Sequence, residues 1–298
     1  MKIANWIPWA PGSILLTLFL CGGACAPEAI DLNSNDTANI QNETASDAYF
    51  ADSEDISSVT VSSDNATNGG RIQAGGGSRQ IIVNDPRLAC ATVTLELAPN
   101  STLLIPKGLL TIDFGSGCTD NHGNTRKGII SITFNGRRFL PGSSVVTTLT
   151  GYEINGVKIE GTRSVANESN STQADPHFTT TMTGGIITWP DGTTTERNER
   201  VTREWKLGAT SIDNQWLVTG TATGKNRNDL NYSMTITNTL VYRRYCAVNN
   251  EVYMPVSGTK QLVVSDKKIT IDFGAGACDK LVTVTINSKS KIVDLGNN

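Results

Sequence analysis

The sequence predicts an all-β fold, an antiparallel up-and-down meander of roughly 11–13 strands that form a strongly curved sheet, a barrel or a half-barrel. Three observations predict it. From about residue 81 onward, short segments alternate apolar and polar residues, turn sequences separate these segments, and no capped stretch of helical period is recognisable. A two-layer β-sandwich is the alternative, because a flat open sheet does not comfortably hold so many strands.

Residues 1–24 are predicted to be an export signal. Lys2 gives a positive start, and residues 13–20 form an apolar run that is too short to span a membrane. Lipid attachment at Cys25 resembles the bacterial lipoprotein signal, so a lipid anchor at this residue is expected. The alternative is an ordinary signal-peptidase cut, which would leave Pro27 near the new terminus and give a secreted protein.

Residues 25–76 are predicted to be a disordered acidic tether. The segment is polar and low in large apolar side chains, so it buries too little surface to offset its ordering entropy. Residues 26–76 hold nine acidic residues and one basic residue, whereas the rest of the chain from residue 78 carries 23 basic and 19 acidic residues. A flexible spacer of this length would span roughly 40 Å. Residues 77–298 are expected to form a single all-β domain.

An eleven-residue pattern occurs twice in that domain. The run "LTIDFGSGCTD" covers residues 110–120, and "ITIDFGAGACD" covers residues 269–279. We interpret each copy as the return strand of a disulfide-stapled hairpin, in residues 87–136 and 243–288. Four cysteines remain after Cys25, and three pairings are formally possible. The repeat selects Cys90 with Cys118 and Cys246 with Cys278, with the first cysteine of each pair opening a strand.

The repeated segment alternates its side chains. Leu110, Ile112 and Phe114 are expected on one face, and the second copy repeats this arrangement. The aspartates that accompany the glycines are predicted to cap backbone N–H groups in the following turns. Calcium ligation is the weaker alternative for them, because each loop offers only two carboxylates. These aspartates are Asp113, Asp120, Asp272 and Asp279.

Asn155-Gly156 is the clearest hairpin signal in the chain and predicts a type I′ turn. A two-residue loop pairs Ile154 with Val157, and it places the neighbouring Glu153 opposite Lys158. One face of the hairpin is then apolar, while the other opposes unlike charges. The glycines at 151 and 161 are predicted to bend the sheet.

Longer strands are expected from residue 178 to residue 245. The segment "TTTERNERVTREW" offers three carboxylates that could in principle serve glycoside hydrolysis. Arginines interleave with them, so we predict a solvated cross-strand charge ladder. The carboxylates are Glu196, Glu199 and Glu204. Three tryptophans in this region could stack on sugars, with core packing as the alternative role. They are Trp189, Trp205 and Trp216.

The chain resembles exported or lipid-anchored proteins of Bacteroidota bacteria in four features. They are the doubled Asp-Phe-Gly motif, the segments "GYEINGVKIEGTR" and "DNQWLVTGTATG", and the run "YCAV". The resemblance covers most of residues 88–287. It implies an envelope location and a stapled β-fold, and it supplies no catalytic residue.

Signals for catalysis and for nucleic-acid binding are poor. His122 and His177 lie in loop-like contexts without the spacing of a zinc site, and no nucleophile elbow or phosphate-binding glycine loop occurs. The basic residues form no stripe, so nucleic acid is not an expected partner. We expect no catalytic residue, no metal and no cofactor.

The sequence therefore favours a lipid-anchored envelope protein, at the outer membrane, with a non-catalytic binding or structural role. The concave face of the curved sheet would hold a hydrophobic ligand such as a lipid. A glycan-binding module and a hydrolase without a recognisable motif are the alternatives. The expected partners are the membrane, through the N-terminal lipid, and a lipid or glycan ligand.

Overall fold

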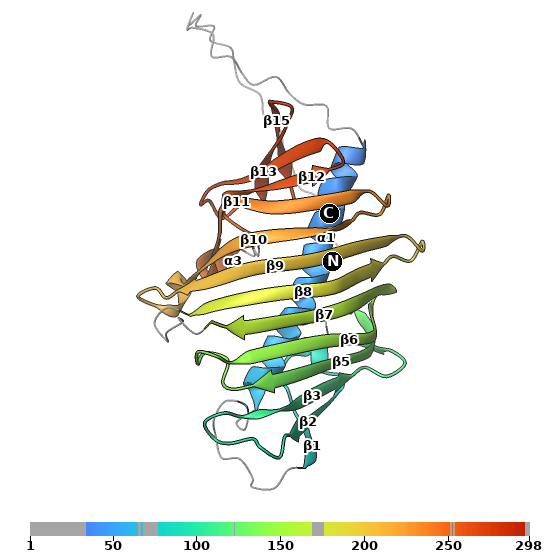
Figure 1. Cartoon of the computed structure of the whole chain (residues 1–298), viewed down its shortest axis with the longest axis vertical. Helices are drawn as coiled ribbons and strands as arrows, with labels where there is room; N and C mark the ends of the chain where they lie inside the picture. Colours follow the sequence, from blue (N-terminus) through green and yellow to red (C-terminus); the bar gives the residue numbers. More distant parts are fainter. Residues whose placement is uncertain are drawn as a thin grey trace, which may run out of the picture.

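The computed structural model describes residues 34–64, 67, 77–121, 123–168, 176–250, 252 and 254–295. The predicted signal peptide, the predicted lipid-attachment residue Cys25 and His122 lie outside these residues. Figure 1 shows one large sheet with a long helix, α1, running behind it across the strands.

The described residues form fifteen strands in one antiparallel sheet, which confirms the predicted up-and-down meander. Fourteen strands follow one another in chain order, and the two-residue β4 pairs only with β5. The edge strands β1 and β15 are far apart in this order, so the sheet is open and does not close into a barrel. The strands are β1 (Ser78–Ile81), β2 (Thr92–Leu97), β3 (Lys107–Asp113), β4 (Cys118–Thr119), β5 (Thr125–Asn135), β6 (Ser144–Ile154), β7 (Val157–Asn167), β8 (His177–Thr188), β9 (Thr194–Lys206), β10 (Gln215–Lys225), β11 (Asn231–Arg243), β12 (Ser257–Val264), β13 (Lys267–Ala275), β14 (Leu281–Ile286) and β15 (Lys289–Asp294).

Four helical segments accompany the sheet in the described residues. The long one is α1, and the others are a single turn or two at the ends of strands. They are α1 (Ser34–Ser63), η1 (Pro86–Leu88), η2 (Ser211–Asp213) and α3 (Arg244–Asn250).

The predicted hairpin is confirmed in detail. Ile154 pairs with Val157, and Glu153 pairs with Lys158. Asn155 has φ 52° and Gly156 has φ 83°, as a type I′ turn requires. The register shifts between residues 149 and 152, at the predicted glycine bend, so the backbone there forms a bulge.

Both predicted disulfides are present, Cys90–Cys118 and Cys246–Cys278. One detail of the prediction was wrong, because Cys246 lies in α3 and does not open a strand. Its fully buried sulfur packs with Val252 and Val256 in a small cluster of its own. The disulfide therefore ties α3 to the connection between β13 and β14.

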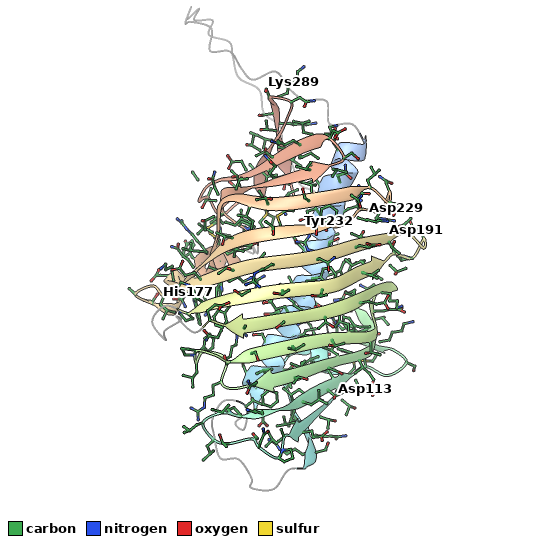
Figure 2. All side chains as sticks on the ribbon, viewed as in Figure 1. Asp113, His177, Asp191, Asp229, Tyr232 and Lys289 are labelled. Carbon is green, nitrogen blue, oxygen red and sulfur yellow. A yellow bond between two sulfur atoms is a disulfide. The ribbon has the colours of Figure 1, made fainter. Side chains whose placement is uncertain are left out.

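The two copies of the repeat end at opposite edges of the sheet. Strands alternate in direction along the meander, and β3 and β13 occupy positions of opposite parity in the order, so they run in opposite directions. One of these two edges, where strands begin and end, therefore holds α3 and five connections. They are β2–β3, β5–β6, β9–β10, β11–β12 and β13–β14. We call this edge the α3 edge. In Figure 2, the label of His177 marks it on the left, and Asp191 and Asp229 mark the opposite edge.

The prediction of a disordered tether was wrong for residues 34–63, which form α1. The buried side chains of this helix recur every three or four residues, as they do on a packed helix face. Most of them are polar, which is why hydrophobic periodicity did not reveal the helix. The buried positions are Asp36, Asn39, Ile40, Glu43, Ser46, Phe50, Ser53, Ile56, Ser57, Thr60 and Val61.

Three buried hydroxyls of α1, those of Ser53, Ser57 and Thr60, donate hydrogen bonds to carbonyls of the helix itself. Ser53 Oγ donates to the carbonyl of Phe50 at 2.8 Å, and Thr60 Oγ1 donates to the carbonyl of Ile56 at 2.8 Å. Such back-bonds allow serine and threonine to face a neighbouring element without an unpaired hydroxyl. The apolar contacts between helix and sheet form two clusters. Phe50 packs with residues of β2–β8, and Ile40 packs with residues of β9–β15.

Candidate functional site

The acids of α1 meet the bases of the sheet along the whole helix. Near its start, Asp36 pairs with Lys267 of β13, and near its middle Glu43 pairs with Arg197 of β9. Just past its end, Asp64 pairs with Arg79 of β1 at 2.8 Å. The negative charge of the acidic N-terminal segment is therefore matched by basic residues of the sheet across this interface.

Arg197 is the centre of the largest ion-pair cluster. Its side chain is 2% exposed, and it contacts Glu43 at 2.9 Å, Asp47 at 2.6 Å and Glu199 at 2.6 Å. Lys260 of β12 adds contacts of 3.1 Å to Asp47 and 3.7 Å to Glu43. Burial acts to lower the pKa of Arg197, but these three carboxylates outweigh it and raise the pKa, so the guanidinium remains charged.

A second cluster surrounds Glu54, which lies about two helical turns after Asp47 on α1. Its carboxylate contacts Arg163 of β7 at 2.6 Å and Arg203 of β9 at 3.0 Å. Burial acts to raise the pKa of Glu54, but Arg163, Arg203 and the nearby Arg138 outweigh it and hold the pKa below its usual range. Glu54 is therefore ionised at neutral pH and fixes the helix to the sheet.

A third cluster lies at Arg126 of β5, which is 3% exposed. It contacts Asp52 of α1 at 2.7 Å and Asp120 at 3.0 Å, and it donates a hydrogen bond to the Tyr152 hydroxyl. Burial raises the pKa of Tyr152, so its hydroxyl stays neutral at physiological pH. Side chains of three separate segments thus converge on one guanidinium.

A cavity of about 750 Å³ lies between α1 and the sheet, on the side of the helix that faces the α3 edge. Pockets of about 300–1,000 Å³ are the usual size for small-molecule sites. Its walls on the helix side include Phe50, Glu54 and the exposed Ala51. The sheet side is mainly apolar and includes Val165, Phe178, Val201, Val218, Met234 and Leu240.

Two cations and one hydroxyl of the cavity wall lack a hydrogen-bonded or salt-bridged partner among the described side chains. Among the described residues, no carboxylate lies within salt-bridge distance of the wall cations Arg138 and Lys280, which belong to the β5–β6 and β13–β14 connections. Burial lowers the pKa of the Arg138 guanidinium, which is the sign of a cation that the protein itself stabilises poorly. The Thr180 hydroxyl is fully buried in the wall and has no hydrogen-bond partner within the described ranges. A ligand with an anionic end would satisfy these groups.

An aromatic cluster leads from the α3 edge to this cavity. Phe139, 38% exposed, lies 5.1 Å from Trp205, which stacks on Trp216 at 5.1 Å with an interplanar angle of 20°. Trp216 lies 6.1 Å from Phe178, and both line the cavity. Two of the three predicted sugar-stacking tryptophans therefore stack on each other.

Trp189 lies at the opposite edge. Arg227 sits over its ring at 4.6 Å, Tyr49 of α1 meets it edge-on at 5.7 Å, and its indole N–H donates to Thr195. One face of this ring is thus occupied by a cation, which fits a packing role.

The repeated aspartates cap the turns that follow them. Asp113 accepts from the Gly115 amide at 2.7 Å, and Asp272 accepts from the Gly274 amide at 2.8 Å. Asp279 accepts from the Leu281 amide at 3.1 Å, and Asp120 accepts from the Asn124 amide at 2.9 Å in addition to its pair with Arg126. The capping role is confirmed. Within the described residues, no group of three or more His, Cys, Asp or Glu side chains is placed to hold a metal ion.

The predicted solvated charge ladder was wrong for half of its members. Arg197 and Glu199 are 1% and 8% exposed and face α1, whereas Glu196 and Arg200 are exposed on the other face. Glu204 pairs with Lys206 and lies 3.8 Å from His177. The three carboxylates proposed for hydrolysis are therefore separated, since Glu199 lies on the face opposite the other two.

Sequence reasoning missed the cavity cations and the acids of α1. The charge separation between residues 26–76 and the rest of the chain was the signal that could have found the acids, because opposite charges in one folded chain tend to pair. No comparable signal marked Arg138 or Lys280.

Comparisons with known proteins add no relationship. No family model matches the chain, and no match was found among curated proteins or solved structures. Of the helices in the described part of the chain, none is both long enough and apolar enough to cross a membrane.

Proposed function

We propose that this chain is a lipid-anchored protein of a bacterial cell envelope, attached through Cys25, whose folded part is a non-catalytic carrier of an amphipathic ligand. The ligand has an apolar tail and an anionic end, as a fatty acid does. The observation that carries the proposal is the cavity between α1 and the sheet, with its volume of about 750 Å³.

The wall chemistry supports this ligand class. An apolar tail would replace water against Val218, Met234 and Leu240, which gains free energy with each buried methylene, about 0.8 kcal/mol. The anionic end would lie near Arg138 or Lys280, neither of which has a carboxylate within salt-bridge distance among the described residues. Binding of this kind needs no catalytic group, in keeping with the scattered positions of Glu196, Glu199 and Glu204.

Native mass spectrometry of the purified mature chain and titration with a dansyl-labelled fatty acid test the proposal. We expect saturable binding at a single site. Val218→Trp fills the cavity and is expected to weaken binding by about tenfold or more, which corresponds to about 1.4 kcal/mol. Thr219→Trp, on the exposed face of the same strand, is the matched control and is expected to bind as the unaltered chain does.

A second variant keeps the test valid if Val218→Trp does not fold. Leu240→Trp fills the cavity from the neighbouring strand β11, and circular dichroism checks both proteins. The proposal is rejected if the unaltered chain carries no lipid and binds no dansyl-labelled fatty acid. It is also rejected if both folded variants bind as well as Thr219→Trp does.

A further inference from the structure

The β2–β3 connection exposes three consecutive large apolar residues. Leu103, Leu104 and Ile105 are 50%, 74% and 52% exposed. Such positions in turns are usually taken by glycine, proline, asparagine, aspartate or serine, so an apolar run there requires an explanation. Contiguous exposed apolar side chains mark interaction sites more often than single ones do.

The connection is an ordered turn that presents these side chains. The Thr102 amide donates to the Ile105 carbonyl at 3.2 Å, and the Ile105 amide donates to Thr102 Oγ1 at 3.0 Å. Leu103 and Leu104 are therefore the two central residues of a closed turn. The Lys107 amide, which donates to Ser101 Oγ at 3.0 Å, holds the base of the turn.

The β5–β6 connection lies against this turn and extends its surface. The Gly136 amide donates to the Pro106 carbonyl at 2.7 Å, and Arg137 donates to the Leu103 carbonyl at 2.6 Å. The next residues along the chain are Arg138 and the exposed Phe139. The β5–β6 connection thus presents a fourth exposed apolar side chain, Phe139, three residues beyond the contact with Pro106.

The charge of this surface is of one sign. Residues 98–107 and 136–143 contain no acidic residue, and besides Arg138, which lines the cavity, their basic residues are Lys107 and Arg137. Apolar side chains at a tip with basic side chains behind them match a membrane surface, where the tip enters the acyl boundary and the cations meet anionic headgroups. A protein partner with an apolar socket would not require this basic collar.

We propose that residues 98–107 and 136–143 form a membrane-inserting tip that binds anionic lipid bilayers, a contact separate from any lipid at Cys25. The tip lies at the α3 edge, and the aromatic cluster of Phe139, Trp205 and Trp216 connects it with the cavity. A lipid taken from or given to the bilayer would pass along this aromatic surface. The membrane contact itself does not depend on the proposed function of the cavity.

Vesicle flotation with the mature chain from residue 26, which lacks any acyl group, tests this proposal. The probes are vesicles of phosphatidylcholine alone and of phosphatidylcholine with phosphatidylglycerol. We expect binding to the anionic vesicles, and about a tenfold or greater loss of that binding in the combined variant Leu103→Ser, Leu104→Ser and Ile105→Ser, since binding strength scales with the apolar area inserted. The matched control is Leu281→Ser with Ile292→Ser, two residues 46% and 66% exposed at the far end of the sheet, which are expected to bind normally.

The contribution of the basic residues to membrane binding is tested separately. Lys107→Glu with Arg137→Glu is expected to abolish the preference for phosphatidylglycerol, because two of the cations behind the tip are reversed. Val218→Trp, which blocks the cavity, is expected to leave vesicle binding unchanged, so failure of the carrier function and failure of this proposal are distinguishable.

Three results would overturn the membrane assignment. The first is that the unaltered chain floats with neither vesicle, and the second is that the serine variant floats as well as the control. The third is a concentration-dependent dimer, seen by sedimentation velocity, that the serine variant loses, since this would make the tip a contact between copies of the chain.

Discussion

Substitution of Arg197 is expected to detach α1 from the sheet. The Arg197 side chain is 2% exposed, and it contacts three carboxylates, those of Glu43, Asp47 and Glu199. In Arg197→Met these three negative charges keep two cations within salt-bridge distance among the described residues. Lys260 lies beside Glu43 and Asp47, and Arg163 lies 3.6 Å from Glu199. Removing one member of a buried ion cluster typically costs about 3–5 kcal/mol, because the remaining charges stay buried with less compensation.

The loss is measurable in two ways. For a chain of this size each kcal/mol moves the melting temperature by about 2–4 °C, so a decrease of roughly 6–20 °C is expected. Amide hydrogen exchange should show that protection falls most in α1, while β2–β8 stay protected, because the cluster joins the helix to the sheet and not strand to strand.

Two further variants make the reasoning refutable. Arg200→Met lies on the same strand with its side chain exposed on the other face, and it is expected to change stability by less than about 0.5 kcal/mol. Adding Glu43→Gln and Glu199→Gln to Arg197→Met removes two of the three carboxylate charges and leaves Asp47 beside Lys260, so it should recover part of the loss. Equal stability of Arg197→Met and Arg200→Met would refute the reasoning, as would a triple variant less stable than Arg197→Met alone.

Two other predictions concern acid and the second disulfide. The folded-state pKa of Glu54 lies below its unfolded value, because Arg163, Arg203 and Arg138 together outweigh the effect of its burial. The contribution of Glu54 to stability is therefore present at neutral pH and lost as the pH falls below about 4. Amide hydrogen exchange of α1 at pH 7 and pH 3 checks this prediction. Unchanged protection factors at pH 3 would contradict it. Cys246→Ala with Cys278→Ala opens a loop with a sequence separation of 32 residues and is expected to cost roughly 3.5 kcal/mol, read from urea denaturation; a loss under about 1 kcal/mol would contradict the constraint assigned to this bridge.

The sheet could be predicted from the sequence because its information is local. The Asn155-Gly156 turn fixes the register of the hairpin that it closes, and alternation assigns Ile269 and Ile271 to the buried face, where they are 0% and 1% exposed. The duplicated motif identified both disulfides for the same reason, since each links segments a few tens of residues apart.

The helix and the cavity could not be predicted because their information is not local. The packed face of α1 is made of residues such as Asp36, Glu43 and Ser53, which resemble a solvated segment when read along the chain. They become an interface only opposite bases on strands more than a hundred residues away, such as Arg197. The cavity exists because α1 covers part of the sheet and leaves the part beside the α3 edge free, which no pattern within a single element records.

The distance in sequence between the helix and its partners also sets the order of folding. Asp36 and Lys267 are 231 residues apart, so the first described helix to be synthesised cannot complete its contacts until β13 has been made. Closing so long a loop is entropically costly, and native contacts of high sequence separation form slowly. The later strands must therefore be in place before α1 completes its contacts with the sheet, and until then the uncompensated negative charge of the helix favours solubility.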